Sequence, residues 1–113
     1  MQNARVSLTA DGTGTLSYAG KVVPCLGKAG FNYKKDITNS GKEGSEKFKE
    51  KYSNEWQAWM YWAVLIDGER GVYIHEGATS GTSAGCIHVA APNAEDFYNW
   101  VNQPTRITIS FPW

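Results

Sequence analysis

The sequence predicts a mainly β domain, a sandwich or partly open barrel of roughly six to eight strands with one or two short helices. Three observations support this prediction. Short β-prone runs near the N-terminus are separated by glycine-containing turns. A long aromatic and β-branched segment, residues 56–66, leads into an Asp-Gly turn. The chain closes on residues 105–111, in which apolar and polar side chains alternate with the period of a strand.

Length and composition indicate one folded domain, residues 1–113. The 113 residues are 42% hydrophobic and 13% aromatic, which is too rich for a disordered chain and too short for two cores. Eleven basic and eleven acidic residues give a formal net charge of zero, which favours neither nucleic acid nor a polybasic membrane interaction.

No membrane span and no signal peptide are expected. The longest mostly apolar run, Ala58–Ile66, is about half of the roughly 20 residues that a span needs. Met1–Leu8 lacks the basic and apolar regions of a signal peptide. The chain would then be a mature form, a cytosolic protein or a protein exported by another route.

The N-terminal part is predicted to be a β-meander. Turns are expected at Asp11-Gly12 and Ala19-Gly20. Pro24 cannot donate a ladder hydrogen bond, so its strand should lie at an edge or carry a bulge. The expected strands are Val6–Thr9, Gly14–Tyr18 and Lys21–Leu26.

The polar segment that follows, Gly30–Ser53, is predicted to contain a short exposed helix over Gly44–Tyr52. Oppositely charged residues such as Glu43 and Lys47 fall at helical spacing there. The charge run is interpreted as a solvated helix face, with a binding patch or a lid as the alternative.

The aromatic segment Trp56–Ile66 is predicted to pair with Gly71–Ile74 through the Asp67-Gly68 turn. Alternation would place Met60, Trp62, Val64 and Ile66 in the core and leave Trp59 and Tyr61 nearer solvent or ligand. The alternative is a central strand with both faces buried.

An amphipathic helix is predicted over Asn93–Asn102, with Asn93 as the N-cap and Asp96 in a weakened capping box. Its apolar face would comprise Phe97, Trp100 and Val101. The closing strand, residues 105–111, would then place Ile107, Ile109 and Phe111 on one face.

Cys86 has the surroundings of a nucleophile. Gly85 and the small residues Ser83 and Ala84 leave room for a substrate carbonyl and for backbone N–H groups aimed at it. His75 ends an apolar strand, where a general base would be held rigidly. Structural roles for a single Cys and a single His are the commoner alternatives.

Other uses of the cysteines and histidines have less support. Cys25 and Cys86 could form a disulfide, but their sequence contexts differ and separate roles are expected. His75, Cys86 and His88 lack the paired spacing of a zinc site, so no metal is predicted.

The segment GVYIHEGATSGTSAGCIHVAAPNAEDFYNWV resembles the catalytic region of YkuD-type L,D-transpeptidases. That family has an apolar strand ending in His-Gly, a glycine-bearing loop, Ser-His-Gly-Cys-Ile-Arg and an Asp-containing helix. The resemblance implies that Cys86 is the acylated nucleophile and His75 its base. It also implies that the Glu76 backbone carbonyl orients the His75 ring, and that the Gly85 and Cys86 amides stabilise the oxyanion.

Two departures from the family motif distinguish this chain. Ala84 stands where the family has a second histidine, and His88 stands where an arginine follows Cys-Ile. His75 and Cys86 are also only eleven positions apart. These features are similar to a compact branch that includes peptidoglycan-targeting effectors of type VI secretion systems.

The function implied by the resemblance is peptidoglycan acyl transfer without a cofactor. Cys86 would attack the carbonyl preceding the terminal D-residue of a stem tetrapeptide and release D-alanine. An amine acceptor would give a crosslink or an exchanged D-amino acid, and water would give L,D-carboxypeptidase activity. Ser83, Trp59 and His88 are the expected substrate contacts.

The expected partners are peptidoglycan stem peptides, with an immunity or delivery protein as a further candidate, and the expected site of action is the periplasm or cell envelope. Two alternatives remain: a non-catalytic module that binds muropeptides or a protein on the same fold, and a cytosolic cysteine hydrolase. An activated Cys86 should be alkylated near neutral pH faster than an ordinary cysteine.

Overall fold

The computed structural model describes residues 1–113 and is mainly β, as the sequence predicts. The structure has one helix, α1, and nine strands, one more strand than the upper end of the predicted range. The elements are β1 (Gln2–Leu8), β2 (Thr13–Tyr18), β3 (Lys21–Leu26), β4 (Asp36–Asn39), β5 (Lys47–Ser53), β6 (Ala58–Asp67), β7 (Val72–Glu76), β8 (Ile87–Val89), α1 (Asn93–Trp100) and β9 (Thr105–Ser110).

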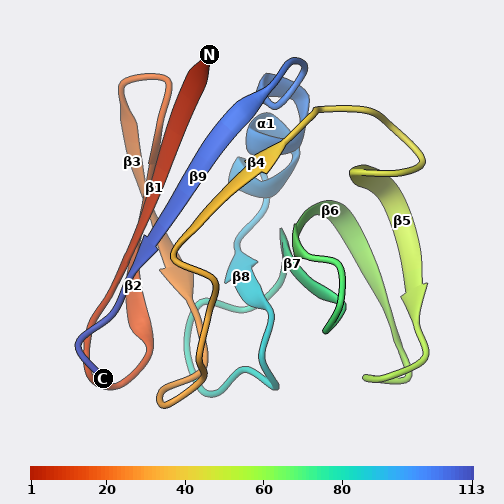
Figure 1. The fold of residues 1–113 in the computed structure, drawn as a ribbon. Coiled ribbons are helices and arrows are strands. Elements are labelled where there is room, and N and C mark those ends of the chain that lie inside the picture. Colours follow the sequence, from red (N-terminus) through yellow and green to blue (C-terminus); the bar gives the residue numbers. More distant parts are fainter.

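All nine strands belong to one curled sheet, in the order β4-β9-β1-β2-β3-β8-β7-β6-β5 (Figure 1). Two pairs are parallel, β1 with β9 and β7 with β8, and the other pairs are antiparallel. The curl brings β4 close to β6, where the buried Asn39 amide donates to Leu65 O at 2.9 Å. The architecture is therefore a partly open barrel.

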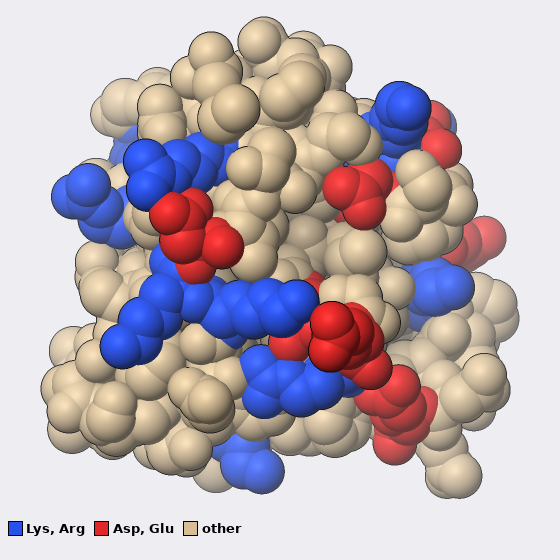
Figure 2. Space-filling view, viewed as in Figure 1, with Lys and Arg blue, Asp and Glu red and all other residues tan.

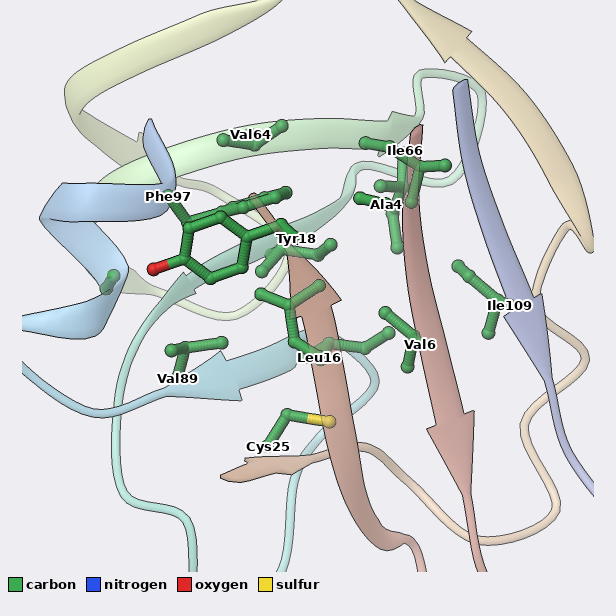
Figure 3. Close-up of a cluster of buried hydrophobic side chains, with 14 of the residues drawn as sticks. Ala4, Val6, Leu16, Tyr18, Cys25, Val64, Ile66, Val89, Phe97 and Ile109 are labelled. Atoms are coloured by element: carbon green, nitrogen blue, oxygen red, sulfur yellow. The ribbon is translucent and has the colours of Figure 1, made fainter. Parts of the chain in front are cut away.

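The helix fills the inside of this curl. Figure 1 shows α1 between the two arms of the sheet, and it contacts β6 and β7. Phe97 is fully buried and its ring lies 5.1 Å from that of Tyr18. Figure 3 shows how side chains from both arms meet Phe97, with Cys25 in the same cluster. Both cysteines are free, so no disulfide joins Cys25 to Cys86.

The N-terminal meander is confirmed as β1, β2 and β3. Pro24 pairs with Thr15 on the β2 side. On its other side β3 meets β8 at a single pair, Leu26 with His88. The Pro24 nitrogen therefore faces a largely unpaired edge, where a missing N–H costs nothing.

The predicted helix over Gly44–Tyr52 is wrong, because this segment contains strand β5. Its charge pairs are worth only about 0.2 to 0.5 kcal/mol each on a helix. As a strand it pairs with β6 from Lys47–Val64 to Ser53–Ala58. Lys47 is buried and donates to Tyr98 O at 2.8 Å, so part of the charge run faces the core rather than water.

Strand β6 does not alternate as expected. Trp62 has φ +53°, which interrupts the period of two. Trp62 consequently packs with the main core near Tyr98, whereas Met60 and Ala63 join a separate small cluster. The prediction that Met60 shares the face of Trp62 is therefore wrong. Trp59 and Tyr61 are exposed, as predicted.

The boundaries of α1 also differ from the prediction. Pro92, not Asn93, occupies the N-cap, and no side chain caps the helix. Asp96 instead accepts hydrogen bonds from Tyr18 Oη at 2.7 Å and Lys21 Nζ at 2.8 Å. The helix ends at Trp100 rather than near Asn102. The Asp96 carboxylate, which was predicted to cap the helix, thus binds side chains from β2 and β3 instead.

Charged residues of both signs are mixed on the surface. Figure 2 shows basic and acidic side chains side by side on the face viewed in Figure 1. Arg106 pairs with Asp36 at 2.6 Å, and Lys34 lies 3.6 Å from the buried carboxylate of Asp67. No helix is long and apolar enough to cross a membrane.

Candidate active site

The parallel pairing of β7 with β8 brings His75 and Cys86 together. His75 lies on β7 opposite His88 of β8, and Cys86 immediately precedes β8. The intervening residues 77–85 form a loop that returns the chain to the same end of the sheet. Two residues eleven positions apart therefore reach one site.

A cavity of about 380 Å³ joins these two side chains. Its remaining lining comes largely from the start of β6 and the loop before Cys86. The lining residues are Trp56, Ala58, Trp59, Met60, His75, Thr82, Ala84, Cys86 and His88. An apolar cavity with a thiol and imidazoles at its wall has the composition of a small-substrate site.

The ring of His75 is held by the next residue in the chain. His75 Nδ1 lies 2.7 Å from the Glu76 carbonyl oxygen, which can only accept, so Nδ1 carries the hydrogen. Burial is the main cause that lowers the pKa of His75 to about 4; the Glu76 hydrogen bond opposes this shift and the nearby His88 adds to it. His75 is therefore neutral at pH 7, with the Nε2 lone pair available as a base.

The thiol of Cys86 is protonated and buried in this arrangement. The residue is 3% exposed, and its Sγ lies 3.9 Å from Gly71 O. Burial raises the pKa of the thiol, while the Tyr73 backbone N–H and the Trp56 indole N–H oppose the rise. This direction is opposite to the lowered pKa expected of a pre-activated thiol. No hydrogen bond joins Cys86 to His75.

Ser83 and Gly85 shape the loop that precedes Cys86. Gly85 has φ +152°, which residues with a side chain rarely adopt, and an added Cβ would lie 3.1 Å from the Phe31 ring, so another residue would be strained there. Its N–H donates to Ser83 Oγ at 3.1 Å, and the Ser83 hydroxyl donates to Cys86 O. Ser83 is thus buried in the loop and is not among the residues that line the cavity.

This hydrogen bonding bears on the expected oxyanion donors. The Gly85 N–H is occupied by Ser83. The Cys86 N–H takes part in no hydrogen bond of the structure. Of the two amides expected to stabilise an oxyanion, only that of Cys86 is free in this arrangement.

Residues 9–109 match the YkuD family, the L,D-transpeptidase catalytic domain. The chain belongs to this family. Among solved structures, L,D-transpeptidase 1 of Mycobacterium tuberculosis is 18% identical with a TM-score of 0.68, over 98% of this chain and 63% of that one. An L,D-transpeptidase of Mycobacterium smegmatis is 20% identical with a TM-score of 0.65, over 95% and 58%.

The L,D-transpeptidase of Stackebrandtia nassauensis is 14% identical with a TM-score of 0.64, over 95% of this chain and 55% of that one. At such identities these similarities establish the fold of the YkuD domain. The chain spans less than two thirds of the length of these relatives. A search of curated proteins finds no match.

In this YkuD domain, His88 lies against both the loop and the base. Its Nδ1 lies 3.0 Å from Ala78 O, and its ring centroid lies 4.9 Å from that of His75. Gly77 permits this packing, because an added Cβ there would lie 2.8 Å from the His88 ring. His88 therefore ties the loop to β8 while one edge of it faces the cavity.

Trp59 of β6 and Ala84 of the loop before Cys86 both line the cavity. Trp59 is 56% exposed, and its ring packs edge-on against Tyr52 with centroids 5.4 Å apart. Ala84 stands at the position of the family's second histidine; it is exposed and lines the cavity with its methyl group.

Three aromatic residues near Cys86 were not identified from the sequence. Trp56 lines the cavity, and its buried indole N–H lies beside the Cys86 thiol, whose pKa it lowers. Phe31 and Tyr33 reach Gly85 from the segment between β3 and β4. Their positions depend on a long-range contact, so no local sequence signal could have indicated them. No group of three or more His, Cys, Asp and Glu side chains is arranged to hold a metal ion.

Proposed function

We propose that this chain acts on peptidoglycan stem peptides as an L,D-transpeptidase that forms an acyl-enzyme on Cys86. The observation that carries the proposal is the meeting of a thiol and a neutral imidazole at one cavity, with the imidazole Nδ1 hydrogen fixed by Glu76 O. Family membership supports the chemistry. Action at the cell envelope follows from this substrate.

The reaction begins with proton transfer. His75 Nε2 removes the thiol proton as the Cys86 sulfur attacks the carbonyl preceding the terminal D-residue. For this attack the thiol must give up its contact with Gly71 O and turn toward His75. Such a rearrangement is compatible with catalysis, because catalytic hydrogen bonds often form fully only when substrate is bound. The Cys86 N–H is the free loop amide that can stabilise the oxyanion.

Collapse of the tetrahedral intermediate completes the first half. The C–N bond breaks, the imidazolium returns its proton to the amine of the departing D-alanine, and a thioester remains on Cys86. An acceptor amine or water then attacks the thioester, with His75 again taking the proton. An amine gives a crosslink or an exchanged D-amino acid, and water gives a tripeptide.

The test uses tetrapeptide-bearing muropeptides and mass spectrometry, with and without an added D-amino acid. The wild-type protein should release D-alanine, and Cys86→Ala should abolish turnover. Cys25→Ala is the matched control, because Cys25 lies in the main core away from the cavity. Loss of activity in Cys25→Ala but not in Cys86→Ala would refute the assignment.

A covalent probe supports the same test. One similar solved structure is described as LD transpeptidase LdtMt1 in complex with imipenem. Imipenem presents a strained carbonyl to a nucleophile, so acylation of this chain should add the mass of the drug to Cys86. Peptide mapping identifies the modified residue.

A non-catalytic muropeptide-binding module is the second candidate. The raised pKa of Cys86 and the alanine at position 84 favour it. Under that function muropeptides would bind unchanged, and Cys86→Ala would bind as well as the wild type. The compact effector-like branch, with its immunity or delivery partner, and the substrate contacts of Trp59 and His88 remain predictions.

A further inference from the structure

Tyr33 carries a buried hydroxyl next to the nucleophile loop. The residue is 3% exposed and lies between β3 and β4, with its ring centroid 4.6 Å from that of Phe31. Its Oη donates to Gly85 O at 2.6 Å and accepts the Lys28 backbone N–H at 2.7 Å. The hydroxyl thus links the end of β3 to the residue before Cys86.

The surroundings of the hydroxyl are built around it. An added Cβ at Gly27 would lie 3.0 Å from Tyr33 Oη and 2.8 Å from a Leu8 methyl, so glycine at that position leaves the space that the hydroxyl occupies. Burial raises the pKa of Tyr33 to about 12. The hydroxyl therefore stays protonated, and remains a donor to Gly85 O, throughout the neutral range.

Anchoring Gly85 O determines the direction of the next amide. The Gly85–Cys86 peptide bond is trans, since the one cis bond of the chain is Ala91–Pro92. In a planar trans peptide the C=O and N–H point in opposite directions. A carbonyl held by Tyr33 therefore points the Cys86 N–H in the opposite direction within the peptide plane, away from Tyr33.

We propose that Tyr33 is a positioning residue, which holds the Gly85–Cys86 peptide so that the Cys86 N–H can donate to the oxyanion formed during acylation. This inference rests on the proposed function. It matters in this chain because Ser83 already occupies the Gly85 N–H, which leaves one loop amide for the task. A peptide plane without its anchor could rotate and misalign that donor.

The test is Tyr33→Phe, which deletes the hydroxyl and keeps the ring packing. Two reactions of Cys86 are timed on the same preparation. Acylation by imipenem, or by a tetrapeptide muropeptide, passes through an oxyanion, whereas alkylation by iodoacetamide displaces iodide and forms none. Tyr18→Phe is the control, because its hydroxyl bonds to Asp96, outside the cavity.

The expected result is an acylation rate lowered about 10- to 100-fold, less than the roughly 10²- to 10³-fold cost of deleting an oxyanion donor outright. The alkylation rate should remain within about two-fold of wild type, and KM should change less than kcat. Tyr18→Phe should acylate at the wild-type rate.

Unchanged acylation in Tyr33→Phe would overturn the inference while the proposed function stood. Parallel loss of acylation and alkylation would also overturn it, because Tyr33 would then be needed only to keep the loop folded. A wild-type protein that is alkylated at Cys86 but acylated by neither substrate would remove the proposed function, and the inference with it.

Discussion

The acid limit of activity should reveal the burial of His75. A general base works only in its neutral form, so activity falls as the pH drops through the pKa of that base. An ordinary histidine has a pKa near 6.5. Burial lowers that of His75 to about 4, so the acid limb of kcat/KM should lie near pH 4.

The difference is largest around pH 5. A base with a pKa of about 4 is roughly 90% neutral there, whereas a base with a pKa near 6.5 is only about 3% neutral. The rate at pH 5 should thus be about 30-fold higher than a solvated histidine would permit. The assay is D-alanine release from a disaccharide tetrapeptide, measured as kcat/KM from pH 4 to pH 8.

The same shift affects stability, so each rate must be corrected for the folded fraction. Between pH 6.5 and about 4 the unfolded chain binds a proton at His75 that the folded chain does not, and the free energy of unfolding therefore decreases as the pH falls. The loss is at most about 3 kcal/mol, and less because the ring is partly exposed. An acid limb centred at pH 6 to 7, with the protein still folded, would refute the reasoning.

Three further predictions concern the surroundings of the site. Cys86 should react with iodoacetamide at pH 7 more slowly than an ordinary cysteine, because burial raises the pKa of its thiol. Trp56→Phe should slow the reaction further, because it removes an N–H that opposes this rise. A wild-type alkylation rate that rises with pH around a midpoint near neutral pH would contradict this prediction. His88→Ala should lower kcat/KM by less than the roughly 10²- to 10⁴-fold expected of losing the base in His75→Ala. The reason is that His88 holds the loop through Ala78 O and does not take the proton. Equal losses in His88→Ala and His75→Ala would assign the base role to both histidines. Trp62→Ala should cost about 2 to 4 kcal/mol in urea unfolding, because its partly buried ring packs on Tyr98, whereas Trp59→Ala should leave stability within about 1 kcal/mol and weaken muropeptide processing. Equal destabilisation by both tryptophan variants, with full activity of the folded fraction, would exclude a substrate role for Trp59.

Local features of the sequence were sufficient where short-range physics decides the structure. The β6–β7 turn covers residues 68–71 rather than Asp67-Gly68, but Asp67 still stabilises it by accepting the Glu69 and Arg70 N–H groups. His75 lies near the end of the strand that follows, so the approximate position of the base can be predicted from turn chemistry. The bond between His75 Nδ1 and Glu76 O likewise joins adjacent residues. The N-terminal meander follows from its two glycine turns in the same way.

Long-range contacts decided the rest. The charged segment that contains Lys47 has weak helical pairs, and it becomes strand β5 because β6 pairs with it at every position except Lys49. Asp96 leaves the helix cap for Tyr18 and Lys21, which are more than seventy positions away in the sequence. Such competition cannot be read from one segment alone.

The sequence by itself determined the chemical groups of the candidate site and the strands that carry them, because a nucleophile after a glycine and a base at a strand end are encoded within a few residues. Only the tertiary structure decided how those groups are tuned. Burial raises the pKa of Cys86 and lowers that of His75, and the Tyr33 hydroxyl crosses from a distant loop to hold Gly85 O. Desolvation and contacts between distant segments arise only when the sheet curls, since both depend on which parts of the chain exclude water from one another.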